Sequence, residues 1–355
     1  MKKISILLPD FRGGGAEKVF ILLANEWSRM GFDVEFLVLR SDGEFAQEVM
    51  NKFIVHDLKA NKYRHSLIKL INFFRKGETE ILIIGLWPLT AIGALAAKLS
   101  SKNIRTIVTE HSILTESFAH KGLVHRYLLM LSCIITFRMA HARIGVSKGV
   151  SKEISKLSCL KPNKILTINN PIEKYTPNVD NLIEYDIPTI ITAGSFKDVK
   201  NHALLIEAFK LVSEKKECQL IILGDGKLKS SYIELINKYG LVNKVKLCGF
   251  VPEPKKYFIN ADVFVLSSNN EGFGNVLIEA MQCGLTIVST DCPSGPREIL
   301  DNERFGKLVP VKNVELLADA IIDSLNEPTN KDILKNRSEE YVVEKIAMKY
   351  LEAFK

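Results

Sequence analysis

A short polar turn between an apolar run and a helical segment carries the residues best suited to bind a charged ligand. Val263–Leu266 is apolar at every position, and polar residues, Glu271 and two glycines follow it. Glycine lets a backbone approach a ligand closely, and the first N–H groups of a helix, together with its dipole, attract a phosphate. The pattern therefore predicts a seat for a diphosphate and a sugar at Gly272, Phe273, Gly274 and Asn275.

Two carboxylates belong to the same stretch. Glu271 lies in the turn, where it can reach a sugar hydroxyl, and Glu279 lies about one helical turn in from the start of the helix, where it can reach a ribose. With helix between them they would be about 12 Å apart, too far for the carboxylate pair of a glycosidase. Taken alone, such a pair fits a capped helix with solvent-facing glutamates better, but the strand and the glycines favour a ligand site.

A second glycine loop and a histidine stand at the ends of other apolar runs. Gly13, Gly14 and Gly15 precede a helical segment that begins near Ala16, and they too offer backbone N–H groups to a ligand. A plain tight turn would account for one glycine, though less readily for three. His111 follows a buried run that ends at Thr109, so we expect it to project into a cleft beside the first domain. A single histidine without this context would more often be structural.

The elements that must position these residues alternate along the whole chain. Short β-branched runs alternate with helical segments, as in parallel sheets covered by helices on both faces. Residues 171–188 contain three prolines and no periodicity, which predicts a linker. We expect an α/β fold with Rossmann-like domains at 1–171 and 188–337 that face each other across a cleft. A helix at about 340–355 is expected to pack back on the first domain.

The strands predicted in the first half are Ile4–Leu8, Val34–Leu39, Ile54–Leu58, Ile81–Ile84, Arg105–Thr109, Ala142–Val146 and Ile165–Ile168. Those in the second half are Thr189–Thr192, Gln219–Leu223, Val245–Leu247, Val263–Leu266, Thr286–Ser289 and Lys307–Val309. The helices predicted there are Ala203–Ser213, Leu228–Tyr239, Asn275–Gln282 and Val314–Leu325, and a last one at Glu340–Phe354. In sheets of this kind, ligands lie beyond the carboxyl ends of the strands.

The chain resembles the family-4 retaining glycosyltransferases, whose fold, GT-B, has two Rossmann-like domains. Glu271–Glu279 resembles their E-x7-E signature, and the resemblance covers nearly the whole chain. Any one motif would be weak, whereas their order and spacing together are specific. The other motifs are Gly13–Lys18, Glu110–Ser112, Gly145–Lys148, Asn169–Ile172, Ala193–Asn201, Leu223–Gly226, Gly249–Val251 and Asp291–Glu298.

The resemblance implies a role for each matching residue. His111 and Glu271 would be the catalytic residues, and His111 would touch the donor sugar. Gly14 and Gly15 would approach the donor diphosphate or the acceptor, and the backbone at Val251 would bind the nucleobase edge. The implied reaction transfers a hexosyl or N-acetylhexosaminyl group and retains the α-linkage. The acceptor hydroxyl would attack from the front face, with the departing phosphate as its base.

One position departs from the family pattern. Members usually carry an arginine directly after the glycine of this loop and a lysine five residues later, and both clamp the diphosphate. Here Lys200 is present, but Ser195 stands at the arginine position and cannot supply a bidentate cation. Lys197 could compensate, or it and Lys200 could simply be surface residues of a loop.

The loop Pro293–Arg297 resembles that of members that use UDP-sugars in bacterial surface-polysaccharide and O-antigen assembly. It implies a UDP-linked donor, such as UDP-GalNAc, UDP-GlcNAc or UDP-Gal, and a carbohydrate acceptor linked to undecaprenyl diphosphate. No D-x-D triplet occurs, so we expect no metal and no cofactor besides the sugar nucleotide as co-substrate. Lys200, the helix start and backbone amides would then neutralise the leaving group.

Basic residues are concentrated in the first half of the chain. Residues 1–170 carry 25 Lys and Arg against 14 Asp and Glu, whereas residues 171–355 carry 23 against 27. Segments 60–76 and 120–143 mix basic residues with Leu, Ile and Phe. They fit either an anionic membrane surface or ordinary amphipathic helices with one side in the core.

The six cysteines form no C-x-x-C pair, and no apolar run approaches the roughly 20 residues of a spanning helix. We therefore expect a cytoplasmic protein with reduced core thiols, either soluble or peripheral on the inner face of the cell membrane.

Other classes of protein remain open at this point. A sugar-nucleotide 2-epimerase would share the two-domain fold but would need no acceptor. A basic nucleic-acid-binding protein would account for the charge but not for the glycine loops, so we expect no nucleic-acid partner. A nicotinamide-dependent dehydrogenase is disfavoured because no G-x-G-x-x-G follows the first strand.

Overall fold

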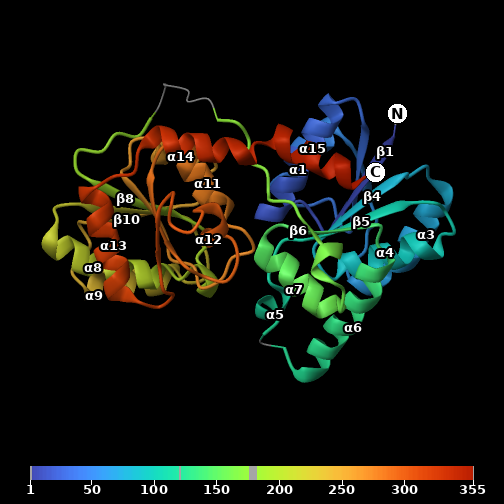
Figure 1. Cartoon of the computed structure of the whole chain (residues 1–355), viewed down its shortest axis with the longest axis horizontal. Helices are drawn as coiled ribbons and strands as arrows, with labels where there is room; N and C mark the ends of the chain where they lie inside the picture. The colour runs from blue at the N-terminus through green and yellow to red at the C-terminus, as the bar shows by residue number, and fades with distance from the viewer. Residues whose placement is uncertain (1, 120, 176–181, 355) are drawn as a thin grey trace. The chain divides into compact units, whose positions relative to one another are not determined.

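The apolar runs form two parallel sheets, each in a unit of its own (Figure 1). The computed structural model describes residues 2–119, 121–175 and 182–354. One unit comprises Met1–Glu173 and Val342–Lys355, and the other comprises Lys174–Tyr341. The middle of the predicted linker, residues 176–181, lies outside the described residues. Residues 182–188 run along the second unit, where Ile183 N donates to the Lys256 carbonyl oxygen at 3.3 Å.

The sheet of the first unit has the order β3-β2-β1-β4-β5-β6-β7. Its central strands are buried along nearly their whole length, which explains why they appear in the sequence as continuous apolar runs. The predicted strand Ile165–Ile168 is shorter than expected, because only two of its residues pair with β6. The strands are β1 (Lys3–Leu8), β2 (Asp33–Val38), β3 (Ile54–Asp57), β4 (Ile81–Gly85), β5 (Arg105–Glu110), β6 (Ala142–Gly145) and β7 (Leu166–Thr167).

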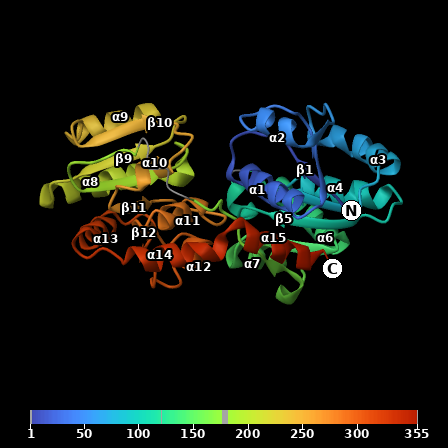
Figure 2. The ribbon, with the colours of Figure 1, turned by 90° about the horizontal axis from the view of Figure 1, so that it is seen from above.

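Helices of the first unit connect successive strands, and the last helix of the chain joins them. The helices are α1 (Gly15–Arg29), α2 (Ala46–Lys52), α3 (Ser66–Lys76), α4 (Leu89–Leu99), α5 (Leu114–Ser117), α6 (Leu123–Met139), α7 (Lys148–Ser158) and α15 (Val343–Ala353). Helix α15 lies beside α1 in Figures 1 and 2, and Trp27 Nε1 donates to the Ala347 carbonyl oxygen at 3.4 Å. The same indole contacts the rings of Tyr350 and Phe354.

The predicted single helix at Glu340–Phe354 is wrong at its start. A 3-10 turn occupies Glu339–Tyr341, and α15 begins only at Val343. At this break the chain returns from the second unit to the first. Val343 N there donates to the carbonyl oxygen of Ile172, in the segment that leaves the first unit, at 3.0 Å.

The sheet of the second unit has the order β10-β9-β8-β11-β12-β13. Its strands are β8 (Thr189–Ala193), β9 (Gln219–Leu223), β10 (Val245–Gly249), β11 (Val263–Leu266), β12 (Thr286–Thr290) and β13 (Lys307–Val309). Its helices are α8 (His202–Lys215), α9 (Lys229–Lys238), α10 (Lys255–Phe258), α11 (Asn275–Gln282), α12 (Pro296–Ile299), α13 (Val314–Asn326) and α14 (Lys331–Ser338). The strand order reverses between β8 and β11, and in the first unit between β1 and β4. Such switch points are where open α/β sheets bind ligands.

All six cysteines are free, as expected, but not all are core residues, because Cys159 is exposed where α7 ends. In the ranges that the structure describes, no helix is both long enough and apolar enough to cross a membrane.

The packing of α15 on the first unit gives a stability prediction. Ile346 is fully buried, whereas Met348 on the same helix is about half exposed. Ile346→Ala should lower the free energy of unfolding by about 2–5 kcal/mol because it leaves a cavity, while Met348→Ala should change it by less than about 0.5 kcal/mol. Urea denaturation of both variants measures the difference. Equal effects would contradict the packing of α15 described above.

Candidate active site

An ion pair joins the loops that follow two neighbouring strands of the second unit. Lys200 Nζ lies 2.5 Å from Glu271 Oε1, and Ser268 Oγ donates to the same oxygen at 2.7 Å. The side chains of Lys200 and Glu271 are only 22% and 10% exposed. Both side chains are therefore mostly buried. Glu271 is not a solvent-facing glutamate beside a capped helix, and Lys200 is not an ordinary surface residue of a loop. They lie beyond the carboxyl ends of β8 and β11, at the switch point.

Several further hydrogen bonds hold these two loops together. Asn269 N donates to the Val199 carbonyl oxygen at 2.8 Å, and Ser267 Oγ donates to the Lys200 carbonyl oxygen at 3.0 Å. Asn201, in the left-handed region with φ 45°, caps α8 and also donates from Nδ2 to Asn269 Oδ1 at 3.2 Å. The backbone around the ion pair is thus fixed from both strands.

The turn from Gly272 to Gly274 is held from the side of β12. Ser294 Oγ donates to the Gly272 carbonyl oxygen at 3.0 Å. At Gly295, where φ is 91°, a Cβ would lie only 1.8 Å from the Phe273 carbonyl oxygen. The Phe273 side chain is buried and contacts the Tyr341 ring. Any contact of Phe273 with a ligand must therefore come from its backbone.

Helix α11 begins at a glycine. Its N-cap is Gly274, with φ 100°, and no acidic residue lies in its first turn. The dipole of the helix is therefore not offset by a carboxylate of its own first turn, which suits a phosphate. Glu279 lies on this helix and is half-buried. The 12 Å separation expected for the two glutamates assumed a continuous helix, and this assumption is wrong because α11 begins only at Asn275.

The remaining predicted residues of this unit lie on loops that follow β8 and β10. Ser195 is half-buried two residues after β8, whereas Lys197 is exposed. Val251 is half-buried after β10, which is the edge strand and stands two strands away from β8. Ser195 thus shares the Lys200 loop, and Val251 lies on a different loop.

His111, Gly14 and Gly15 belong to the first unit. Gly14 is the N-cap of α1, and Gly15 is its first residue, with open space where a Cβ would be. The Glu17 carboxylate lies against this loop, since a Cβ on Gly14 would be 2.2 Å from Glu17 Oε2. A negative charge already occupies the start of α1, so this loop suits a neutral hydroxyl better than a phosphate.

His111 follows β5, and its neighbours fix its ring. Its Nε2 is 3.0 Å from Thr109 Oγ1, and the ring packs edge-on against Phe20 of α1 at 5.1 Å between centroids. Burial lowers the pKa of His111 to about 4, although a hydrogen bond with the Asn170 side chain acts in the opposite direction. The imidazole is therefore neutral at neutral pH and can act as a hydrogen-bonding group but not as a cation.

The structure adds two carboxyl groups that sequence reasoning left without a role. Glu110, the last residue of β5, is fully buried, and it accepts from Thr90 Oγ1 at 2.9 Å and Trp87 N at 3.3 Å. Burial raises its pKa to about 8. Glu153 of α7 accepts from Leu114 N at 2.6 Å and so anchors the loop after His111. The position of Glu110 at the end of an apolar strand is the sequence signal that could have identified it as a buried carboxyl group.

Among the described residues, no three His, Cys, Asp or Glu side chains gather in a group that could hold a metal ion.

Two protein-family models match the chain. Residues 13–174 match the model described as Glycosyltransferase Family 4, and residues 179–341 match the one described as Glycosyl transferases group 1. Both describe the same class of enzyme, and the matched ranges contain the switch-point loops of each sheet. This chain is therefore a glycosyltransferase. It belongs to family 4, and its fold is GT-B, as the motifs predicted.

Relatives with names and solved structures agree with this assignment. The N-acetylgalactosamine-N,N'-diacetylbacillosaminyl-diphospho-undecaprenol 4-alpha-N-acetylgalactosaminyltransferase of Campylobacter jejuni is 27% identical, covering 95% of this chain and 94% of that protein. The amylovoran biosynthesis glycosyltransferase AmsD of Erwinia amylovora is 25% identical, covering 86% and 85%. The structure of Anabaena Alr3699/HepE in complex with UDP and glucose has a TM-score of 0.81 at 18% identity, covering 100% of this chain and 99% of that one. At this identity the structural likeness shows the fold alone.

The buried Glu110 gives a prediction about stability and pH. Its carboxyl keeps its proton up to about pH 8 in the folded protein, whereas in the unfolded chain it loses the proton near its ordinary pKa of 4.5. The folded state therefore binds more protons in this window, so the free energy of unfolding falls as pH rises through it. His111 and His202, with pKa values lowered from 6.5 to about 4, act in the opposite direction below pH 6.5.

Between pH 6.5 and 8, Glu110 should therefore be the only one of these three groups that makes the free energy of unfolding depend on pH. The wild type should lose up to about 1.4 kcal/mol per pH unit in this range, and Glu110→Gln, which keeps the neutral shape, should remove that slope. Urea denaturation of both proteins at several pH values measures it. The same slope in both proteins would show that Glu110 is ionised when folded.

Proposed function

We propose that this enzyme transfers a hexosyl or N-acetylhexosaminyl group from a UDP-sugar to a carbohydrate acceptor, with retention of the α-linkage and without a metal ion. The observation that carries the proposal is the Lys200–Glu271 ion pair, fixed at the switch point beside the start of α11, whose first turn contains no acidic residue. A cation, a carboxylate and a helix start, brought together by two neighbouring loops, match the diphosphate and the sugar hydroxyls of such a donor.

In this proposal the leaving diphosphate is neutralised by two groups. Lys200 Nζ supplies the positive charge, and the first amides of α11 supply fixed dipoles. Glu271 offsets part of the Lys200 charge, and Ser195 brings none. The start of α11 therefore carries more of the leaving-group charge than it would beside an arginine. The backbone at Val251 would bind the uracil edge, and Glu279 would bind the ribose.

The acceptor hydroxyl would attack the sugar from the face that the phosphate leaves, and the departing phosphate would take the proton. Both hydrogen bonds to Glu271 fall on Oε1, so its second carboxylate oxygen can accept from a donor-sugar hydroxyl. His111 is neutral at working pH and would donate a hydrogen bond to the sugar. The glycine loop at Gly14 and Gly15, whose helix start is met by Glu17, would receive the acceptor.

Relatives support the substrate classes. The Campylobacter relative acts on an undecaprenol-diphosphate acceptor and the Erwinia relative acts in amylovoran biosynthesis, as their names state. A structure of the same fold holds UDP and glucose. We therefore propose a role in bacterial polysaccharide biosynthesis, with an acceptor carried on a lipid diphosphate.

Substitution of the ion pair tests this assignment. Glu271→Gln and Lys200→Ala should each lower kcat about 10²–10³-fold, the loss that follows removal of one preorganised group that stabilises transition-state charge. Lys197→Ala is the matched control, because this lysine lies on the same loop but is exposed, and we expect it to change kcat less than about threefold. UDP release in steady-state assays with matched thermal unfolding curves measures all three. If Lys197 compensated for Ser195, its variant would lose as much as Lys200→Ala.

Ligand binding separates the proposal from its alternatives. UDP should raise the melting temperature of the wild type more than GDP does, and chelation with EDTA should leave transfer unchanged. A 2-epimerase would instead convert the free UDP-sugar without an acceptor, which NMR of the sugar product would detect. The absence of a thermal shift with every nucleotide would contradict nucleotide binding at this site.

A further inference from the structure

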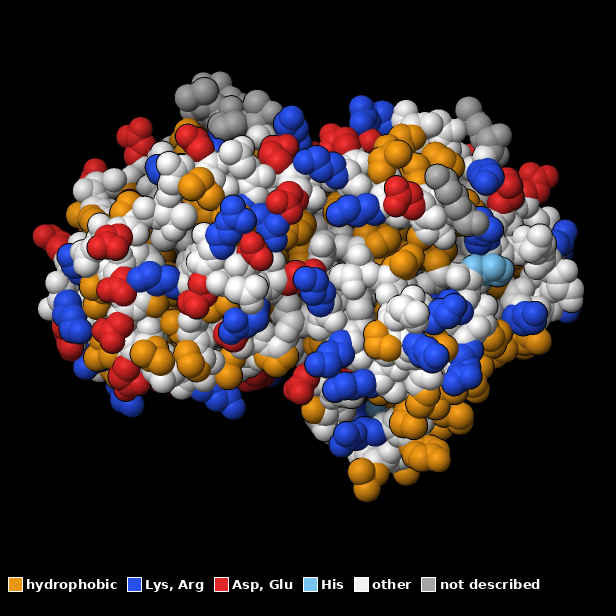
Figure 3. Space-filling view, viewed as in Figure 1, with side chains coloured by type: hydrophobic (Ala, Val, Ile, Leu, Met, Phe, Trp, Pro, Cys, Tyr) orange, Lys and Arg blue, Asp and Glu red, His pale blue; other side chains and the backbone are white. Residues whose placement is uncertain are grey.

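Helix α6 of the first unit exposes an unusually apolar surface. Seven large apolar side chains on it are between 41% and 81% exposed: Leu123, Val124, Tyr127, Leu128, Met130, Leu131 and Ile135. Figure 3 shows hydrophobic side chains gathered over the part of the first unit that contains α6 in Figure 1, with Lys and Arg side chains around them. A water-facing helix surface is normally polar, and apolar patches of this kind mark interaction sites.

The apolar residues of α6 cannot be explained by packing within the unit. The inner face of the helix is formed by the buried residues Leu129, Cys133, Thr136 and Phe137. Val124, Leu128, Leu131 and Ile135 recur at helical spacing and are exposed, so they form a second stripe on the outer side. The helix is therefore apolar on two sides but packed on only one.

A pocket extends this outer surface inward. It has a volume of about 280 Å³ and lies between α5, α6 and α7. Apolar side chains dominate its wall, among them Phe118, Leu123, Tyr127 and Leu157, and Arg126 also lines it. An apolar hollow of this kind with a guanidinium beside it suits a hydrocarbon chain that carries a phosphate at one end.

Positive charge dominates the surface around α6. No Asp or Glu occurs from Ser117 to Lys152, while six Lys and Arg do. Lys121, Arg126 and Arg138 are exposed on or beside the helix. Of the acidic residues that flank this stretch, Glu116 of α5 is exposed, whereas Glu153 is buried and bonded to backbone N–H groups. The surface thus combines exposed apolar side chains with an excess of positive charge.

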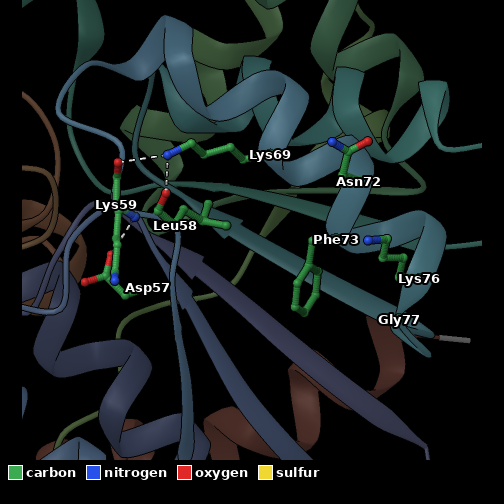
Figure 4. Close-up of a pocket in the computed structure, with 8 residues that line it drawn as sticks. All are labelled: Asp57, Leu58, Lys59, Lys69, Asn72, Phe73, Lys76 and Gly77. Carbon is green, nitrogen blue, oxygen red and sulfur yellow. Dashed lines mark hydrogen bonds between the residues drawn. The ribbon is translucent and has the colours of Figure 1, made fainter.

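The other basic segment predicted from the sequence, at 60–76, contains a helix of a different kind. Helix α3 buries Leu70 and Phe74, and among its large apolar residues only Ile68 is strongly exposed. The open hollow beside it contains Lys59, Lys69 and Lys76 but also Asp57 (Figure 4). Lys69 Nζ donates to the carbonyl oxygens of Leu58 and Lys59 at 2.8 and 2.9 Å. This segment fits the alternative of an ordinary amphipathic helix.

We propose that the seven exposed apolar side chains of α6, together with Lys121, Arg126 and Arg138, dock on an anionic lipid bilayer. Leu123, Val124, Tyr127 and Leu128 enter the interface between headgroups and acyl chains, where an aromatic residue such as Tyr127 is favoured. The basic side chains meet the lipid phosphates. The proposal goes beyond the transfer reaction and does not depend on it.

A second copy of the chain is the other candidate to cover this surface. A symmetric dimer would place the same patch of both copies face to face. It would bring Lys121, Arg126 and Arg138 of one copy near the same residues of the other, with no acidic residue on the stripe to pair with them. Like charges across an interface are unfavourable, so the charge pattern favours a lipid surface.

Sedimentation with vesicles tests the proposal. The wild type should bind vesicles of phosphatidylcholine and phosphatidylglycerol in equal parts and should bind phosphatidylcholine alone much more weakly. The triple variant L123S/V124S/L128S should bind the mixed vesicles at least about tenfold more weakly, because its apolar side chains no longer enter the interface. The matched control is V242S/I333S, which changes two exposed apolar residues of the second unit and should bind like the wild type.

The charge is tested separately. Arg126→Gln should weaken binding to the mixed vesicles about fivefold, which corresponds to about 1 kcal/mol per basic group at the surface, and added salt should weaken wild-type binding. Unchanged melting temperatures would show that the variants fold. Equal binding of the wild type to both kinds of vesicle, or binding to neither, would overturn the proposal.

Sedimentation velocity without lipid tests whether a second copy of the chain covers this surface. The wild type should sediment as a monomer. If the wild type were a dimer and L123S/V124S/L128S a monomer, a second copy of the chain would cover this surface, and the proposal would be overturned. Transfer to a soluble acceptor measures catalysis independently, and the triple variant should retain it. Vesicle binding and the proposed reaction can therefore each fail without the other.

Discussion

The contact on which the candidate site depends is the ion pair between Lys200 and Glu271. It joins residues 71 positions apart, and it does so because β8 and β11 are neighbours at the switch point of their sheet. Charges as poorly exposed as these need a partner and further hydrogen bonds, which Ser268 provides for Glu271. The hydrogen bonds from Asn269 N and Ser267 Oγ hold the loops together. Because the carboxylate is held by its neighbours before any ligand arrives, little reorganisation is needed to present it to a sugar.

The two glycine loops of the chain differ in the charge at the start of the helix that follows each of them. Helix α11 starts at a glycine with no acidic residue in its first turn, whereas the Glu17 carboxylate lies against the start of α1. Both loops have the composition of a phosphate-binding loop, so composition alone cannot distinguish them. The position of the Glu17 carboxylate distinguishes them, because a negative charge at a helix start offsets the attraction for a second anion. This difference is why we propose a charged ligand at α11 and a neutral one at α1.

Much of the fold could be predicted from the sequence, and the reasons for the errors are physical. Buried parallel strands such as Ile81–Gly85 appear as unbroken apolar runs, so most strands lie within a residue or two of their predicted bounds. Helix α14 was not predicted, because Lys331–Ser338 is mostly polar and buries little beyond Leu334. The sequence also could not predict that Lys200 contacts Glu271 or that Glu110 is buried against Trp87 and Thr90. Such contacts depend on strand order and rotamers, and residue spacing carries neither.

The charge imbalance along the sequence acquires a meaning once the units are known. The basic excess belongs to the residues that form the first unit, and the exposed apolar stripe of α6 belongs to the same unit. The basic excess and the exposed apolar side chains are independent properties, because solvated lysines do not require exposed leucines. An apolar dimer interface would not explain both, since positive charge around it would weaken the dimer. An anionic bilayer is the environment that accommodates both, because its phosphates meet the charge and its acyl chains meet the apolar side chains. The ion pair of the proposed donor site lies in the second unit, which has no such basic excess. The two proposed contacts, with the donor and with the bilayer, therefore belong to different units.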